Sequence, residues 1–137
     1  MVNKIDMQNM RYLNLFEKVT GIRTRFCFEY NNYLMFCVPR PMISRALGER
    51  GKNIKRMQEI LRKRIKIVPA PKDSGDAELL IKSIVNPVTI KDVEVTENEV
   101  LVNAGRNKAA LIGRNKRRMI EMGKVTQGFF GKEFRVV

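Results

Sequence analysis

The feature of this sequence that most constrains its fold is a repeat of apolar positions at a spacing of 65 residues. Shifting the chain by this spacing superposes Leu47 and Gly48 on Ile112 and Gly113 without a gap. The other superposed pairs include Phe16 with Ile81, Phe28 with Val93, Met35 with Val100, Cys37 with Val102, Met57 with Met122, Ile60 with Val125 and Ile65 with Phe130. Because the matches persist where the periodicity changes, the sequence predicts two copies of one small unit, in residues 1–70 and 71–137.

Each copy shows the same order of local patterns. In the first copy, Tyr12, Leu15, Phe16 and Val19 have helical spacing, and Gly21 is placed to end that helix. A hairpin over 22–30 and 33–38, helices at about 41–47 and 52–62 and a strand at 64–68 follow. The second copy repeats this order with a helix at 76–85, a hairpin at 88–103, helices from about 107 and a last strand in "KEFRVV". We therefore expect an α+β fold of two α-β-β-α-α-β units, each a three-stranded sheet with its helices on one face.

The two cysteines lie in the first hairpin. If Asn31 and Asn32 form a two-residue turn, residue 27 faces residue 36 and residue 26 faces residue 37. Cys27 and Cys37 then point to opposite faces of the sheet, which argues against a disulfide and predicts two buried free thiols. Free thiols suit a reducing compartment.

The composition argues against metal, cofactor and catalytic chemistry. The chain has no histidine, the commonest general base and metal ligand, and two cysteines are too few for a thiolate zinc site. No carboxylates cluster in a catalytic arrangement, so we expect no enzyme, no catalytic residues, no metal and no cofactor.

The charge balance predicts a polyanionic partner. The chain has 27 Lys and Arg against 14 Asp and Glu, a net charge of +13. A charged surface kept only for solubility intersperses both signs, whereas these basic residues cluster. Nucleic acid is therefore the first candidate partner and an acidic membrane surface the second. No apolar run approaches the ~20 residues of a membrane span, and "MVNKIDMQNMRY" has no signal-peptide core, so we expect a cytoplasmic protein.

The segment "ALGERGKNIKRM" has the properties of an anion-binding turn. The turn from Gly48 to Gly51 lies between two predicted short helices, and basic residues surround it. Glycines allow the backbone to approach a ligand closely, and the N-terminus of the following helix favours an anion. A sugar-phosphate chain can therefore run across this turn. The candidate nucleic-acid-binding residues here are Gly48, Glu49, Arg50, Gly51, Lys52, Asn53, Lys55 and Arg56.

The element order together with "LGERGKNIKRM" resembles a type II KH domain, whose GXXG loop holds a short single strand. The tandem arrangement over residues 5–137 is similar to the short archaeal members of the NusA-like transcription factors. This resemblance implies a factor that binds single-stranded nascent RNA, has RNA polymerase as a candidate second partner, and influences termination or antitermination. We also expect the protein to be a monomer. A ribosomal or ribosome-assembly KH protein is the alternative, although its known form has one KH copy.

The second loop departs from the GXXG pattern. Its candidate RNA-binding residues are Gly113, Arg114, Asn115, Lys116 and Arg117, and Lys116 stands where the first loop has Gly51. The lysine side chain either obstructs close approach of the backbone or replaces amide contacts with a charge contact. The resemblance therefore supports the binding role more strongly for the first loop than for the second.

Overall fold

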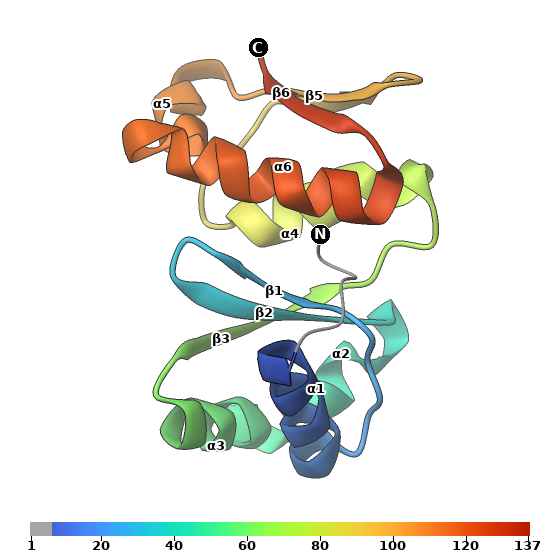
Figure 1. Ribbon diagram of the computed structural model, residues 1–137, viewed down its shortest axis with the longest axis vertical. Coiled ribbons are helices and arrows are strands. Elements are labelled where there is room, and N and C mark those ends of the chain that lie inside the picture. The colour runs from blue at the N-terminus through green and yellow to red at the C-terminus, as the bar shows by residue number, and fades with distance from the viewer. Residues whose placement is uncertain (1–6) are drawn as a thin grey trace. The chain divides into compact units, whose positions relative to one another are not determined.

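The computed structural model describes residues 7–137, which separate into two compact units divided between Ala70 and Pro71. Each unit contains one three-stranded sheet, and its helices cover one face of that sheet (Figure 1). The predicted α+β class and the element order α-β-β-α-α-β are confirmed in both units, with single 3-10 turns added between the elements.

The first unit is built on a sheet with strand order β1-β2-β3. The hairpin strands β1 and β2 are antiparallel, and β3 runs parallel to β2. Its elements are α1 (Met7–Thr20), β1 (Cys27–Tyr30), β2 (Tyr33–Val38), α2 (Ile43–Leu47), α3 (Lys52–Leu61) and β3 (Arg64–Pro69). The connection from β2 to β3 through α2 and α3 places the predicted binding turn between these two helices.

The core of the first unit lies between its helices and one face of β2. Phe16 of α1 stacks on Phe36 of β2 with ring centroids 4.5 Å apart, and both side chains are fully buried. Met57 of α3 is buried in the same cluster, so the periodic apolar face of α3 fixes this helix on the sheet. The polar face of α3, which carries Lys52, Lys55 and Arg56, stays exposed.

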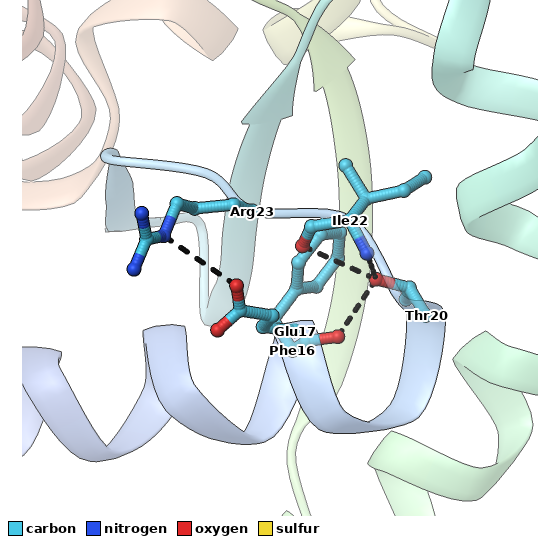
Figure 2. A network of polar contacts seen from close by, with 5 residues as sticks. All are labelled: Phe16, Glu17, Thr20, Ile22 and Arg23. Atoms are coloured by element: carbon cyan, nitrogen blue, oxygen red, sulfur yellow. Dashed lines mark hydrogen bonds and ion pairs between the residues drawn. The ribbon is translucent and has the colours of Figure 1, made fainter.

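The end of α1 is closed by a local polar network (Figure 2). The hydroxyl of Thr20 donates to the carbonyl of Phe16 at 2.7 Å and accepts from the amide of Ile22 at 3.0 Å. Arg23 forms an ion pair with Glu17 at 3.4 Å. The helix ends before Gly21, as the sequence predicts.

The first strand is shorter than predicted. It begins at Cys27, whereas the sequence predicts a strand from residue 22. Residues 22–26 leave the strand pattern because the Thr24 hydroxyl donates to the carbonyl of Cys37 and accepts weakly from the amide of Phe26 at 3.4 Å. The side-chain bonds of a threonine here compete with the regular backbone ladder.

The second unit has strand order β4-β5-β6, again an antiparallel hairpin followed by a parallel third strand. Its elements are α4 (Ala77–Val85), β4 (Asp92–Val95), β5 (Glu99–Asn103), α5 (Lys108–Ile112), α6 (Arg117–Phe130) and β6 (Glu133–Val136). In both units a short helix, a 3-10 turn and a longer helix lie between the second and third strands.

The spacing of 65 holds for the helices and loops but not for the strands. Cys27 pairs with Phe36, and the corresponding pair is Val93 with Val102, which gives a spacing of 66 in the hairpin. The predicted matches of Phe28 with Val93, Met35 with Val100 and Cys37 with Val102 are therefore wrong, because a shift of one residue exchanges the two faces of a strand.

The longer α6 also moves the last strand. Leu34 pairs with Ile65 whereas Val100 pairs with Phe134, so Ile65 corresponds to Phe134 and not to Phe130. Ile60 and Val125 remain equivalent along their helices, but their burial differs, since Ile60 is 52% exposed and Val125 only 1%.

The cysteine prediction is confirmed. Asn31 and Asn32 both have positive φ, as a two-residue hairpin turn requires, and Cys27 lies opposite Phe36. Neither cysteine is part of a disulfide, and both thiols are buried. Burial raises the pKa of the Cys37 thiol far above its usual value, and the neighbouring Cys27 raises it further.

We predict that neither cysteine reacts with a water-soluble thiol reagent in the folded protein. A buried thiol cannot reach the reagent, and a thiol with a raised pKa forms little of the reactive thiolate. With Ellman's reagent, the native chain should release almost no chromophore, and the chain unfolded in urea should release two equivalents. Rapid labelling of one thiol under native conditions would mean that at least one of these side chains is accessible to solvent.

Candidate nucleic-acid interface

The first loop, residues 48–51, is a sharp turn with three positive φ angles between α2 and α3. Gly48 has φ 77° and ψ 170°, Arg50 has φ 55° and ψ 29°, and Gly51 has φ 72° and ψ 22°. The amide of Gly51 closes the turn on the carbonyl of Gly48 at 3.1 Å. Glu49 and Arg50 form the exposed tip, and α3 begins at the next residue without a side-chain cap.

The second loop, residues 113–116, has the same backbone conformation although it lacks the second glycine. Gly113 has φ 75° and ψ 171°, Asn115 φ 56° and ψ 29°, and Lys116 φ 62° and ψ 20°. The amide of Lys116 donates to the carbonyl of Gly113 at 3.2 Å, as Gly51 does in the first loop. Lys116 therefore adopts the same turn as Gly51. Its left-handed conformation costs roughly 1–2 kcal/mol of conformational free energy, because the residue has a Cβ.

The space around the glycines explains why the second loop has a glycine at the position of Gly48 but a lysine at the position of Gly51. A Cβ on Gly48 would lie 2.9 Å from the side chain of Asn53, and one on Gly113 would lie 2.6 Å from Cγ of Arg118. Their φ and ψ values also fall in a region that essentially only glycine occupies. A Cβ on Gly51 would meet nothing within 4 Å, so this position needs only a left-handed conformation.

The first loop is braced by Asn53 from the first turn of α3. Its side-chain amide donates to the carbonyl of Ala46 at 3.2 Å and lies 3.4 Å from that of Arg45. These are carbonyls from the end of α2, which have no partners within their own helix. Asn53, predicted from sequence as an RNA contact, thus lies where it fixes the angle between the two helices.

Arg118 occupies the same position in the second loop and is held differently. Its Nη1 lies 3.3 Å from Oε1 of Glu121, one turn further along α6. Arg117 approaches the second oxygen of the same carboxylate, with Nε 3.8 Å away. The polar contact of Arg118 therefore stays within α6, whereas the amide of Asn53 joins α3 to the end of α2.

A shallow depression lies beside each loop, on the outer face of the helix that follows it. The first has a volume of about 480 Å³ and is lined by Glu49, Arg50, Lys52, Lys55, Arg56 and Glu59. The second has a volume of about 660 Å³ and is lined by Arg114, Asn115, Arg117, Arg118, Ile120, Glu121 and Lys124. Six of these positions correspond at the spacing of 65, so the two depressions are equivalent surfaces of the two units.

The structure brings most of the predicted binding residues together. Residues Glu49, Arg50, Lys52, Lys55 and Arg56 line the first depression, and Arg114, Asn115 and Arg117 line the second. Gly48, Gly51, Gly113 and Lys116 shape the turns themselves. The candidate residues predicted from sequence did not include five others that line the depressions: Glu59, Arg118, Ile120, Glu121 and Lys124. These could be found by following the helix from each loop in steps of three and four residues.

Two findings bear on the other function classes. Within residues 7–137, no helix is long and apolar enough to cross a membrane. The described side chains also contain no group of three or more acidic or cysteine residues placed to hold a metal ion.

Comparison with known proteins identifies relatives of similar sequence. The sequence matches no family model. It is 29% identical over 89 residues to the "Probable transcription termination protein NusA" of Halococcus morrhuae, a match that covers 65% of this chain and 62% of that protein. It is 28% identical over 115 residues to the protein of the same name from Methanococcus vannielii, and this match covers 80% of this chain and 65% of that protein. The match thus spans less than two thirds of the length of either relative.

The fold has a relative of known structure. The crystal structure of APE1850 superposes with a TM-score of 0.72 at 28% sequence identity, and the match covers 96% of this chain and 99% of that one. The superposition covers nearly the whole of both chains, so the two proteins share the arrangement of their helices and strands as well as part of their sequence. In sequence, the chain therefore resembles archaeal NusA-like proteins, and in fold it resembles APE1850.

Proposed function

We propose that this protein is an RNA-binding transcription factor that holds single-stranded nascent RNA and influences termination or antitermination. Residues 1–70 and 71–137 act as two tandem type II KH domains, and the RNA backbone crosses residues 48–51 and 113–116. We further propose that the protein acts as a cytoplasmic monomer without cofactor or catalysis, and that RNA polymerase is its second partner.

The observation that carries this proposal is the duplicated loop. Two turns with matching backbone angles each lie at the start of a helix that has no side-chain cap. The amides of such a helix start attract anions. Four cations line each adjoining depression, and this positive charge supports the binding of phosphates there.

The strand topology supports the type II assignment. In each unit the helix and hairpin precede the pair of short helices, and the third strand is parallel to the second. This is the order that the KH resemblance requires. The names of the curated relatives support transcription over translation as the process involved.

We predict that RNA affinity falls steeply with salt. Each phosphate contact with a single strand contributes about −0.7 to the slope of log K against log salt, so four or more contacts give a slope of about −3 or steeper. Fluorescence anisotropy with a labelled single-stranded RNA in a potassium chloride series measures this slope. A slope near zero would mean that the basic depressions do not contact phosphates.

Crosslinking in cells, followed by sequencing of the attached RNA, tests the biological role. Nascent transcripts near terminators are the expected partners. Enrichment of ribosomal RNA instead, with co-sedimentation in ribosomal particles, would replace this proposal with the ribosome-associated alternative.

A further inference from the structure

The second depression contains a carboxylate inside a cluster of cations. Glu121 lies 3.3 Å from Arg118 through one oxygen and 3.8 Å from Arg117 through the other. The side chains of Glu121 and Arg118 are only 16% and 21% exposed, so this pair is largely withdrawn from solvent. The carboxylate thus bridges two guanidinium groups at the edge of the binding loop.

The first depression has no such bridge. The position equivalent to Glu121 is Arg56, and the position equivalent to Arg118 is Asn53, whose amide binds the end of α2. Among the described residues, no ion pair joins the side chains that line the first depression, although Glu49 and Glu59 are present there. Each depression therefore carries four cations, of which two, Arg117 and Arg118, form ion pairs with Glu121 in the second depression, whereas the described cations of the first form none with its lining residues.

We propose that Glu121 is a built-in counter-ion that competes with RNA phosphate for Arg117 and Arg118 and so restrains binding by the second unit. Carboxylate and phosphate both accept the paired hydrogen bonds of a guanidinium group. A phosphate reaches Arg117 and Arg118 only by displacing or sharing the contacts of Glu121. This inference rests on the proposed function and describes the regulation of the same site.

A purely structural role for Glu121 predicts the opposite result. The Arg118 side chain packs beneath Gly113, where its Cγ would be 2.6 Å from an added Cβ. If Glu121 mainly held Arg118 in that place, removing its charge would loosen the loop and weaken RNA binding. A competing counter-ion, in contrast, gives tighter binding when its charge is removed.

The test uses the full chain with the first loop changed by Glu49→Asp and Arg50→Asp, so that binding reports the second unit. Glu121→Gln is added to this background, because glutamine keeps the shape and removes the charge. The probe is a fluorescein-labelled single-stranded RNA of about 12 nucleotides and mixed sequence, long enough for a KH site of about four. The control is Glu133→Gln, the same charge change at an exposed position of β6.

Glu121→Gln should tighten RNA binding by about three- to tenfold and steepen the salt slope by about 0.7 for each additional phosphate that the variant binds. Glu133→Gln should change the affinity by less than about twofold, because its charge is outside the depression. We also expect Glu121→Gln to leave the unfolding midpoint unchanged, since the proposed role of Glu121 is competition with phosphate and not stabilisation of the fold.

An affinity that is equal to that of the control, or weaker, overturns the competition. A different result would contradict the proposed RNA-binding function itself. If the first-loop double change leaves RNA binding intact and the further changes Arg114→Asp and Asn115→Asp also leave it intact, neither loop binds RNA, whatever Glu121→Gln does.

Discussion

Replacing Glu49 and Arg50 together by aspartate should weaken binding of single-stranded RNA by about ten- to a hundredfold. The change removes the exposed cation at the tip of the first loop and puts a second carboxylate where a phosphate would lie. Loss of one charge-assisted contact costs roughly 1.5–3 kcal/mol, and each 1.4 kcal/mol is a factor of ten in affinity. Anisotropy titration at fixed salt measures the loss directly.

The fold should survive this change. Arg50 has a left-handed conformation, which aspartate adopts more readily than most residues do, so the circular dichroism spectrum should not alter. Arg11→Asp is the matched control, because it reverses one exposed charge on α1 that does not line the first depression. RNA affinity that is unchanged by the loop variant, or reduced equally by Arg11→Asp, would show that the loop is not a specific contact.

Alanine in place of Gly48 should destabilise the first unit by about 2–3 kcal/mol, whereas alanine in place of Gly51 should cost only about 1 kcal/mol. Gly48 occupies a backbone region that strains other residues by about 1–3 kcal/mol, and its new Cβ would press on Asn53 at 2.9 Å. Gly51 needs only the common left-handed conformation and has open space around it.

Urea or thermal unfolding of the four variants Gly48→Ala, Gly51→Ala, Gly113→Ala and Lys116→Ala checks this contrast in both units. In a unit of this size, 1 kcal/mol corresponds to about 4–8 °C in the melting temperature, so the two glycine variants of the first loop should separate clearly. Lys116→Ala exchanges one residue with a Cβ for another and should be nearly neutral. Equal losses at Gly48 and Gly51 would mean that the contact with Asn53 does not distinguish the two glycines.

The local patterns of the sequence were sufficient to predict the elements and the hairpin of the first unit. Helical spacing placed α1, and the paired asparagines fixed the register of Cys27 with Phe36. These features depend on interactions between residues close in the chain, which is why the sequence alone reveals them.

The length of α6 and the faces of β5 could not be predicted in this way. Arg62 ends α3 by adopting φ 54°, an unusual conformation for arginine that no sequence signal announces, whereas α6 continues to Gly131. The resulting shift of the last strand depends on which residues pair across the sheet. A repeat judged by polarity alone does not detect a shift of one residue, although that shift reverses the faces.

The side-chain contacts beside the two loops could not be predicted from sequence patterns either. Asn53 and Arg118 occupy equivalent positions, yet one reaches back to α2 and the other forward to Glu121. Both are polar residues in a basic helix start, so the sequence indicated ligand contacts for this region. Only the side-chain geometry separates the residues that hold the loop from those that face outward.

The inaccessibility of both native cysteines makes the chain convenient for site-specific spectroscopy. A single cysteine introduced at an exposed position beside either loop, such as Lys124 or Glu59, would be the one position that a maleimide dye modifies in the folded chain. No cysteine-free parent protein is needed, so the arrival of a ligand at each unit can be followed separately in otherwise unaltered protein.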